Sequence, residues 1–276
     1  MNIKVVDKNI EISDISCFSL KETLDCGQAF RWEPIEEGIW QGMAYNKYLK
    51  LSQTQDKIIL FDTTKEDFDN IWYPYFDLDR DYEKIVETLS ANPILKEAAA
   101  FGKGIRILKQ EPWETLCSFI ISQNNNIPRI KGIISRLCEN FGEKTKGGFY
   151  TFPTAEKIST LSLDDLSVIR SGFRAKYILD AAKKIANSEI DLESLETIET
   201  ETAQSQLMKI YGVGKKVAHC VLLFGLSHIN AFPEDVWIKR AMEKLFDGKL
   251  PNCAKGYEGI AQQYIFHYAH TTKLDI

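Results

Sequence analysis

The sequence predicts an α+β fold, with an antiparallel β-sheet domain over residues 1–92 and a mostly α-helical domain over residues 93–276. Three observations support this prediction. Runs of aromatic and aliphatic residues alternate with turn residues before residue 90, apolar residues recur at helical spacing after residue 92, and a turn with two glycines joins two apolar helices near residue 212. This last pattern is a helix-hairpin-helix, and we expect the active site in the cleft between the two domains.

Three short runs predict the strands of the first domain, over residues 40–44, 48–52 and 57–61. They are rich in the residue types that fit a half-buried pleated surface. The polar segments between them are turn-like, so the three strands are expected to form an antiparallel meander. The acidic segment over residues 77–84 is then expected to open the first helix.

Helical periodicity begins at Asn92 and continues through the rest of the chain. Apolar residues recur close to the 3.6-residue period over residues 113–122. The next helix is expected to begin at Pro128, which a first turn accepts, and to end before Gly142. Further helices are expected over residues 155–160, 163–170, 174–186, 202–210, 215–226, 236–245 and 257–269.

Composition indicates a globular protein and leaves its partner open. With 276 residues and 44% hydrophobic content, the chain can bury a sizeable core. The net charge of −5 is unevenly distributed, with −8 over residues 1–90 and +3 over the rest. Charge alone therefore does not decide for or against DNA. No apolar leader and no 18-residue charge-free run is visible, so we expect a cytoplasmic protein.

The six cysteines are scattered without a C-x-x-C pair. This spacing argues against a zinc ribbon and against a four-cysteine iron–sulfur site. We expect buried thiols rather than disulfides. Neither a metal nor a cofactor is expected.

The segment KIYGVGKKVAHC, residues 209–220, carries the most informative chemistry. Gly212 and Gly214 let the backbone take positive φ and approach a ligand closely. The helix that begins near Lys215 then presents unpaired N–H groups and the positive end of its dipole to an anion. A phosphate of a nucleic acid fits such a turn.

Lys216 lies in the first turn of that second helix, where the dipole and the neighbouring Lys215 both disfavour a protonated amine. It is therefore a candidate nucleophile. Cys220 follows four residues later, on the same helix face. Asp235 follows nineteen residues after Lys216, at the end of a loop that contains Pro233. Lysine and aspartate together supply a nucleophile and an anion.

These residues belong to a wider pattern that resembles the helix-hairpin-helix DNA glycosylases with a Gly/Pro-rich loop and an Asp, and among them the 8-oxoguanine DNA glycosylases. Five further segments match in the same order, so the resemblance covers nearly the whole chain. They are CGQAFRW (26–32), IWYPYFDLD (71–79), FIISQNNNIPR (119–129), GFRAKY (172–177) and GIAQQYIF (259–266).

The resemblance implies a bifunctional repair enzyme that excises 8-oxoguanine from duplex DNA and then cleaves the strand. In this interpretation Lys216 attacks the sugar C1′ to form a Schiff base, and Asp235 activates it or stabilises the positive charge on the sugar. The imine acidifies the C2′ proton, so β-elimination follows. The implied partner is double-stranded DNA with oxidised guanine, bound by a monomer that would lie on the nucleoid in a bacterium.

The resemblance also assigns binding residues, after the base is flipped into a pocket. Phe266 and Cys220 would stack on the two faces of the base, Gln262 would pair with its Watson–Crick edge, and the Gly27 carbonyl would accept the N7–H present only in 8-oxoguanine. Pro233 would shape the loop before Asp235. Contacts to DNA are expected from Asn124, Arg129, Phe173, Arg174, Gly212, Gly214, Lys215 and Trp237.

Each assignment has a structural alternative. Lys216 would then only touch a phosphate, Asp235 would only cap a helix, Phe266 would be core and Gln262 solvated. Gly27 would be a turn glycine, the asparagines of residues 124–126 would satisfy helix ends, and Arg174 would be a charge at a helix start. A monofunctional alkylpurine glycosylase, which typically lacks the lysine, and a non-catalytic DNA-binding module remain the alternatives for the whole chain.

Three positions depart from the family pattern. Tyr211 replaces a proline in the turn, Glu234 places a second carboxylate beside Asp235, and Trp237 replaces a histidine that contacts phosphate in eukaryotic members. Glu234 is expected to lower the turnover rate or repel DNA rather than change the reaction class. Trp237, together with Phe173 in place of tyrosine, is expected to relax the preference for the opposite base.

Overall fold

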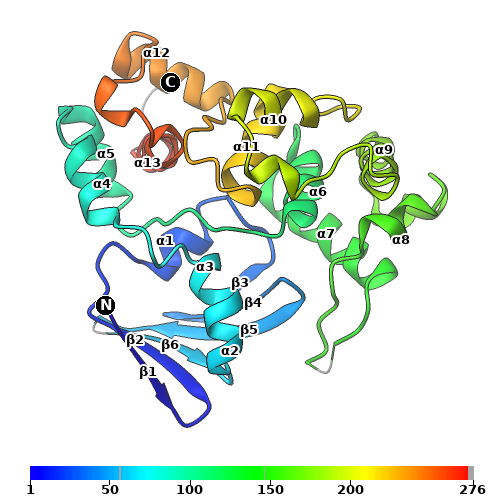
Figure 1. The fold of residues 1–276 in the computed structure, drawn as a ribbon, viewed down its shortest axis with the longest axis horizontal. Coiled ribbons are helices and arrows are strands. Elements are labelled where there is room, and N and C mark those ends of the chain that lie inside the picture. The colour runs from blue at the N-terminus through cyan, green and yellow to red at the C-terminus, as the bar shows by residue number, and fades with distance from the viewer. Residues whose placement is uncertain (56, 146, 273–276) are drawn as a thin grey trace. The chain divides into compact units, whose positions relative to one another are not determined.

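The computed structural model describes residues 1–55, 57–145 and 147–272, and its elements are labelled in Figure 1. The chain forms two compact units. The first, here the sheet unit, consists of residues 1–41, 49–109 and 229–276, and the second, here the hairpin unit, consists of residues 42–48 and 110–228. This division differs from the expected boundary after residue 92, because the helices after residue 229 pack within the sheet unit. The last four residues of the expected second domain, 273–276, lie outside the described residues.

The sheet confirms the predicted α+β class. Its six strands are ordered β1-β2-β6-β5-β4-β3. Their bounds are β1 Asn2–Val6, β2 Asn9–Ser13, β3 Trp32–Glu36, β4 Ile39–Ala44, β5 Lys47–Gln53 and β6 Lys57–Phe61. In the antiparallel register Ile10 lies opposite Leu60 and Ile12 opposite Ile58, and all four are buried. One face of the sheet therefore carries an aliphatic layer, as period-2 alternation requires.

The three predicted strands are confirmed as β4, β5 and β6, each within one residue. The strands β1, β2 and β3 were not predicted individually. In β1 only one residue is even half-buried, so its sequence shows no alternation between an apolar and a polar face. Pairing with β2 holds this edge strand in place. The residues of β1 alone do not reveal that pairing.

Seven α-helices of the sheet unit are described, with a π-helical turn over Phe68–Trp72 and a 3-10 turn over Asn252–Ala254. Their bounds are α1 Leu20–Leu24, α2 Lys65–Asp67, α3 Tyr73–Tyr75, α4 Tyr82–Leu89, α5 Pro93–Phe101, α12 Val236–Phe246 and α13 Glu258–Thr271. The acidic segment does open α4, where Asp81 caps the Lys84 N–H, but three short helices precede it. The C-terminal helix α13 packs against α5 and α12 (Figure 1).

The hairpin unit is mostly helical, and it also contains the tip of the β4–β5 hairpin and an isolated antiparallel bridge between Lys144 and Tyr150. Its helices are α6 Pro112–Ser122, α7 Ile127–Phe141, α8 Ala155–Ser159, α9 Arg174–Ala186, α10 Thr200–Leu207 and α11 Lys215–Gly225, with 3-10 turns over Asp165–Ile169 and Ser194–Glu196. Helices α6 and α11 pack together, and the rings of Phe119 and Phe224 stack between them with centroids 5.4 Å apart. The expected helix over residues 163–170 is one of the 3-10 turns. The helix before the hairpin ends at Leu207, three residues earlier than expected, because residues 208–212 form a turn.

None of the six cysteines forms a disulfide, as predicted. Four of them are buried, whereas Cys17 and Cys253 are half-buried. Within the described ranges, the structure contains no helix that is both long and apolar enough to cross a membrane.

Glu111 caps α6 and lines a cavity of about 470 Å³ in the hairpin unit. Its carboxylate accepts the N–H groups of Trp113 and Glu114 at 3.1 and 2.6 Å. Burial nevertheless raises the pKa of Glu111 to about 7, because desolvation of the charged form outweighs the two backbone hydrogen bonds. This carboxyl group therefore titrates near neutral pH.

We expect Glu111 to reduce stability as the pH rises. The folded state binds this proton more tightly than the unfolded chain, whose glutamate has a pKa of 4.5. Its contribution to the free energy of unfolding is therefore full below pH 4.5 and falls by up to about 3 kcal/mol as the pH passes 7. The denaturant midpoint of Glu111→Gln, measured relative to that of the wild type, should be higher at pH 8 than at pH 5. The exposed Glu156→Gln, from the same cavity lining, should show no such gain; parallel behaviour of both variants would contradict the expectation.

Candidate active site

The hairpin before α11 has the predicted positive φ at Gly212 but not at Gly214, which is extended with φ −97°. Gly212 has φ +82°, and a Cβ there would lie 2.4 to 2.6 Å from ring atoms of Tyr177, so only glycine fits. Gly214 is the N-cap of α11, and no described side chain caps that helix. The first-turn N–H groups of α11 are thus available to an anion from outside the helix.

Tyr211 ties the hairpin to α9 through a bond that a proline could not make. Its backbone N–H donates to Oδ2 of Asp180 at 2.7 Å, and Oδ1 of Asp180 accepts from Lys184 at 2.6 Å. The Tyr211 ring packs edge-on against Tyr177 with centroids 5.1 Å apart. Tyr211 as a whole is 56% exposed. The hydrogen bond to Asp180 therefore anchors the hairpin where the family has a proline. Neither Asp180 nor Tyr177 was singled out from the sequence, because both lie about 30 residues away.

Lys216 is half-buried in the first turn of α11, whereas its neighbour Lys215 is exposed. The Lys216 Nζ lies 5.5 Å from the centroid of the Phe119 ring on α6. Cys220 follows one turn later and is buried. The hairpin unit therefore brings a primary amine, a thiol and an uncapped helix start together on one helix.

Asp235 is the N-cap of α12 in the sheet unit. Its Oδ1 accepts the N–H of Ile238 at 2.8 Å, so the capping alternative is confirmed and a catalytic role is left open. Pro233 is buried in the preceding loop. The neighbouring Glu234 is exposed and lies 3.9 Å from Nζ of Lys239, at the outer limit of an ion pair. Its charge is thus partly offset on the protein surface.

Gly27 lies in a loop of the sheet unit with φ +84°, and a Cβ there would meet nothing within 4 Å. The requirement for glycine is therefore conformational, and the space beside it is open. The next residue holds the loop. The Gln28 amide donates to the carbonyls of Thr23 and Arg106 at 2.9 and 2.8 Å and accepts the N–H of Leu108 at 2.9 Å.

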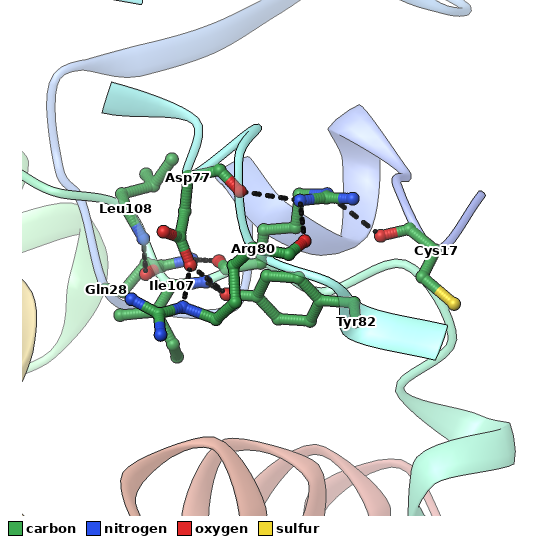
Figure 2. Close-up of polar contacts among 8 residues, drawn as sticks. Cys17, Gln28, Asp77, Arg80, Tyr82, Ile107 and Leu108 are labelled. Carbon is green, nitrogen blue, oxygen red and sulfur yellow. Dashed lines mark hydrogen bonds and ion pairs between the residues drawn. The ribbon is translucent and has the colours of Figure 1, made fainter. Parts of the chain in front are cut away.

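A buried polar network supports the segment to which Gln28 is bound (Figure 2). Arg106 donates to the carbonyls of Asp77 and Cys17 at 2.6 and 3.1 Å. The Tyr82 hydroxyl accepts the N–H of Ile107 and donates to Asp77, both at 2.8 Å. The position of Gly27 thus depends on residues up to 80 positions away in the chain.

Gln262 and Phe266 lie on α13, one turn apart. Gln262 is only 4% exposed, so the alternative of a solvated glutamine is wrong. Phe266 is half-buried and stacks on His270 with ring centroids 6.0 Å apart. Phe266 and the exposed Trp237 of α12 line the same small pocket, so two predicted site residues of the sheet unit lie together.

Four predicted DNA-contacting residues of the hairpin unit, Asn124, Arg129, Phe173 and Arg174, lie at or near the turn before α7. Phe173 is 49% exposed and, with Arg129, lines an open cavity of about 530 Å³. Arg174 is only 2% exposed, and its guanidinium donates to the backbone carbonyls of Gln123 and Asn124.

Arg174 therefore holds the turn in this structure, and a direct contact with a base stays a prediction. Asn124 itself has φ +47°, in the left-handed region. The Asn126 side chain accepts the Arg129 N–H at 3.0 Å and caps α7. The alternative that these asparagines satisfy a helix end is thus confirmed for Asn126.

Comparison with known families divides the chain into two matched parts. Residues 10–116 match the N-terminal domain of 8-oxoguanine DNA glycosylase, and residues 117–253 match the HhH-GPD superfamily of base excision DNA repair proteins. The two matches adjoin and leave only the chain ends uncovered.

Individual relatives agree with these matches. The N-glycosylase/DNA lyase of Saccharomyces cerevisiae is 32% identical over 263 residues, which covers 82% of this chain and 67% of the relative. The 8-oxoguanine glycosylase/lyase of Clostridium acetobutylicum, solved with double-stranded DNA containing cytosine opposite 8-oxoguanine, is 37% identical with a TM-score of 0.93 over 99% of both chains. A 3-methyladenine DNA glycosylase from Archaeoglobus fulgidus, at 18% identity and a TM-score of 0.72, shares the fold.

Proposed function

This chain belongs to the 8-oxoguanine glycosylase branch of the HhH-GPD base excision repair proteins, and from that premise we infer that it excises 8-oxoguanine from duplex DNA and cleaves the strand as an AP lyase. The observation that carries the lyase activity is the half-buried amine of Lys216 at the uncapped start of α11. A glycosylase that activates water needs no such amine, whereas an imine can form only from one.

We propose Lys216 as the nucleophile. Its amine bonds to C1′ of the damaged nucleotide while the bond from C1′ to the base nitrogen breaks, and the base leaves. Opening of the sugar ring then gives an imine between Nζ and C1′. The imine withdraws electrons from C2′, a proton is lost there, and the 3′ phosphate leaves by β-elimination. Phe119 beneath the amine provides an apolar surface that limits its hydration.

Asp235 is proposed as the carboxylate that assists this attack. Positive charge builds on the sugar as the glycosidic bond breaks, and a fixed anion lowers the energy of that state. The cap to Ile238 uses one carboxylate oxygen and orients the group. Pro233 restricts the loop in front of it.

The lesion is proposed to be read at its N7 position by Gly27. The N7–H of 8-oxoguanine donates to the Gly27 carbonyl, whereas guanine presents an acceptor there and would leave two acceptors facing each other, at a cost of about 1 to 3 kcal/mol. Gln28 supports this role because it holds the loop from both sides. Cys220 and Phe266 are proposed to contact the base faces and Gln262 its Watson–Crick edge.

DNA binding is proposed for two surfaces of the hairpin unit and one residue of the sheet unit. The hairpin, with Gly212, Gly214 and Lys215, would bind a phosphate. The surface near α7 would contact the bases at the gap left by the flipped nucleotide, where Phe173 occupies the vacated stack. This surface comprises Asn124, Arg129, Phe173 and Arg174. Trp237 of the sheet unit would contact the DNA backbone.

The decisive test is borohydride trapping on a labelled duplex with one 8-oxoguanine opposite cytosine. We expect a covalent adduct with the damaged duplex and none with the undamaged one. Base release without an adduct would favour the monofunctional alternative with water activated by Asp235. Binding with neither product would leave only a DNA-binding module.

A further inference from the structure

Two adjacent glutamines on α13 form a buried amide pair. Gln262 and Gln263 are 4% and 5% exposed. Nε2 of Gln263 donates to Oε1 of Gln262 at 2.8 Å. Oε1 of Gln263 has no hydrogen-bond partner among the described residues. Among the described residues, the hydrogen bond to the Gln262 side chain comes from its neighbour alone.

The direction of this bond determines what Gln262 can offer to a ligand. An amide has two donor hydrogens on nitrogen and two lone pairs on oxygen. Gln263 occupies one lone pair of the Gln262 oxygen, which leaves the other lone pair and both hydrogens of the Gln262 nitrogen. Reversing both amides would leave both Gln263 hydrogens without an acceptor, in place of one hydrogen and the carbonyl oxygen, and unpaired buried N–H groups are the rarer case. The observed direction is therefore the favoured one.

Purine bases differ in the pattern that this amide would meet. A 6-oxo purine presents an acceptor at O6 and a donor at N1–H, which the Gln262 nitrogen and its remaining oxygen lone pair complement. A 6-amino purine presents a donor at N6 and an acceptor at N1. It would need the opposite amide direction, in which the Gln262 nitrogen faces the nitrogen of Gln263.

We propose that Gln263 is a positioning residue that determines base specificity, because it fixes the amide direction of Gln262 and thereby selects 6-oxo over 6-amino purines. The inference rests on the proposed function, in which Gln262 meets the Watson–Crick edge of the flipped base. Gln263 does not itself contact the base in this proposal. Its effect is therefore a change in the ratio of the excision rates of the two bases.

The test compares single-turnover excision of 8-oxoguanine and 8-oxoadenine from otherwise identical duplexes. Gln263→Met keeps the length of the side chain and removes both polar groups, so the preference for 8-oxoguanine should fall roughly tenfold, the range expected for one mispaired buried polar group. Gln263→Glu, measured at pH 8, offers only acceptors and should draw the Gln262 nitrogen toward itself, lowering the preference further. Exposed Gln55→Met should leave it unchanged.

The outcomes separate the inference from the function beneath it. A folded Gln263→Met with unchanged preference, while Gln262→Met loses it, would overturn the inference and keep the proposed role of Gln262. Unchanged preference in both variants would overturn both roles. If Gln263→Met does not fold, Gln263→Glu decides alone, since a merely structural role would lower both rates equally and leave their ratio intact. A wild type that excises neither base would instead refute the proposed function.

Discussion

Replacing Lys216 by glutamine is expected to abolish the borohydride adduct and strand cleavage and to lower base excision by about 10³-fold or more. That loss corresponds to about 4 kcal/mol of transition-state stabilisation. An amide nitrogen does not form an imine, and glutamine retains the side-chain bulk above the Phe119 ring. Because the side chain is half-buried and the first turn of α11 needs no lysine to form, the fold should persist. Denaturing gels of trapped and cleaved duplex measure both products.

Lys215→Gln is the matched control, since Lys215 is the exposed neighbour on the same helix start. It should retain the adduct and the cleavage. Its DNA binding should weaken for damaged and undamaged duplexes alike, with a salt dependence reduced by about one phosphate contact. If Lys216→Gln releases base at the wild-type rate, the amine is not the nucleophile and the monofunctional mechanism takes its place.

Replacing Asp235 by asparagine is expected to separate the two roles of this residue. Asparagine caps a helix as well as aspartate does, so the bond to the Ile238 N–H should remain. Loss of the negative charge at the start of α12 should lower the free energy of unfolding by no more than about 1 kcal/mol. Base excision should nevertheless fall about 10²- to 10⁴-fold, the usual range for a carboxylate that takes part in the chemical step. Single-turnover kinetics and a denaturant titration measure the two effects.

Glu234→Gln provides the comparison for Asp235. Glu234 is exposed and paired only loosely with Lys239, so its neutralisation should leave excision intact or raise it by relieving repulsion from DNA. Asp235→Ala should lose the cap as well and unfold more easily than Asp235→Asn, by about 1 kcal/mol. Full activity in Asp235→Asn would mean that Asp235 serves α12 alone.

Local sequence signals predicted the parts of this structure that local forces decide. The start of α7 was predicted at Pro128, one residue from its first residue Ile127, because a capping side chain and a fixed φ act within one helical turn. The glycine-dependent turn at Gly212 was visible for the same reason. The edge strand β1 was not visible, because its stability comes from β2 rather than from its own pattern.

The sequence did not predict the surroundings of each functional residue. One alternative placed Gln262 in solvent, but it is buried beside Gln263. The Arg174 guanidinium donates to the backbone carbonyls of the turn before α7. The loop of Gly27 is held by Gln28 against residues near Arg106. Sequence patterns report spacing along the chain, whereas these contacts join residues from one to 80 positions apart and depend on which elements pack together.

The sequence by itself thus determined the fold class and the helix-hairpin-helix, because glycines, caps and hydrophobic periodicity act over a few residues. Its ordered motifs carried the resemblance to the family. The tertiary structure decided how the chain divides into units, why Gly212 admits no side chain, and how Tyr211 is anchored to Asp180 in place of a proline. The reason is physical: burial and hydrogen bonding are properties of packed neighbours, and an amino-acid sequence lists residues without stating which ones meet.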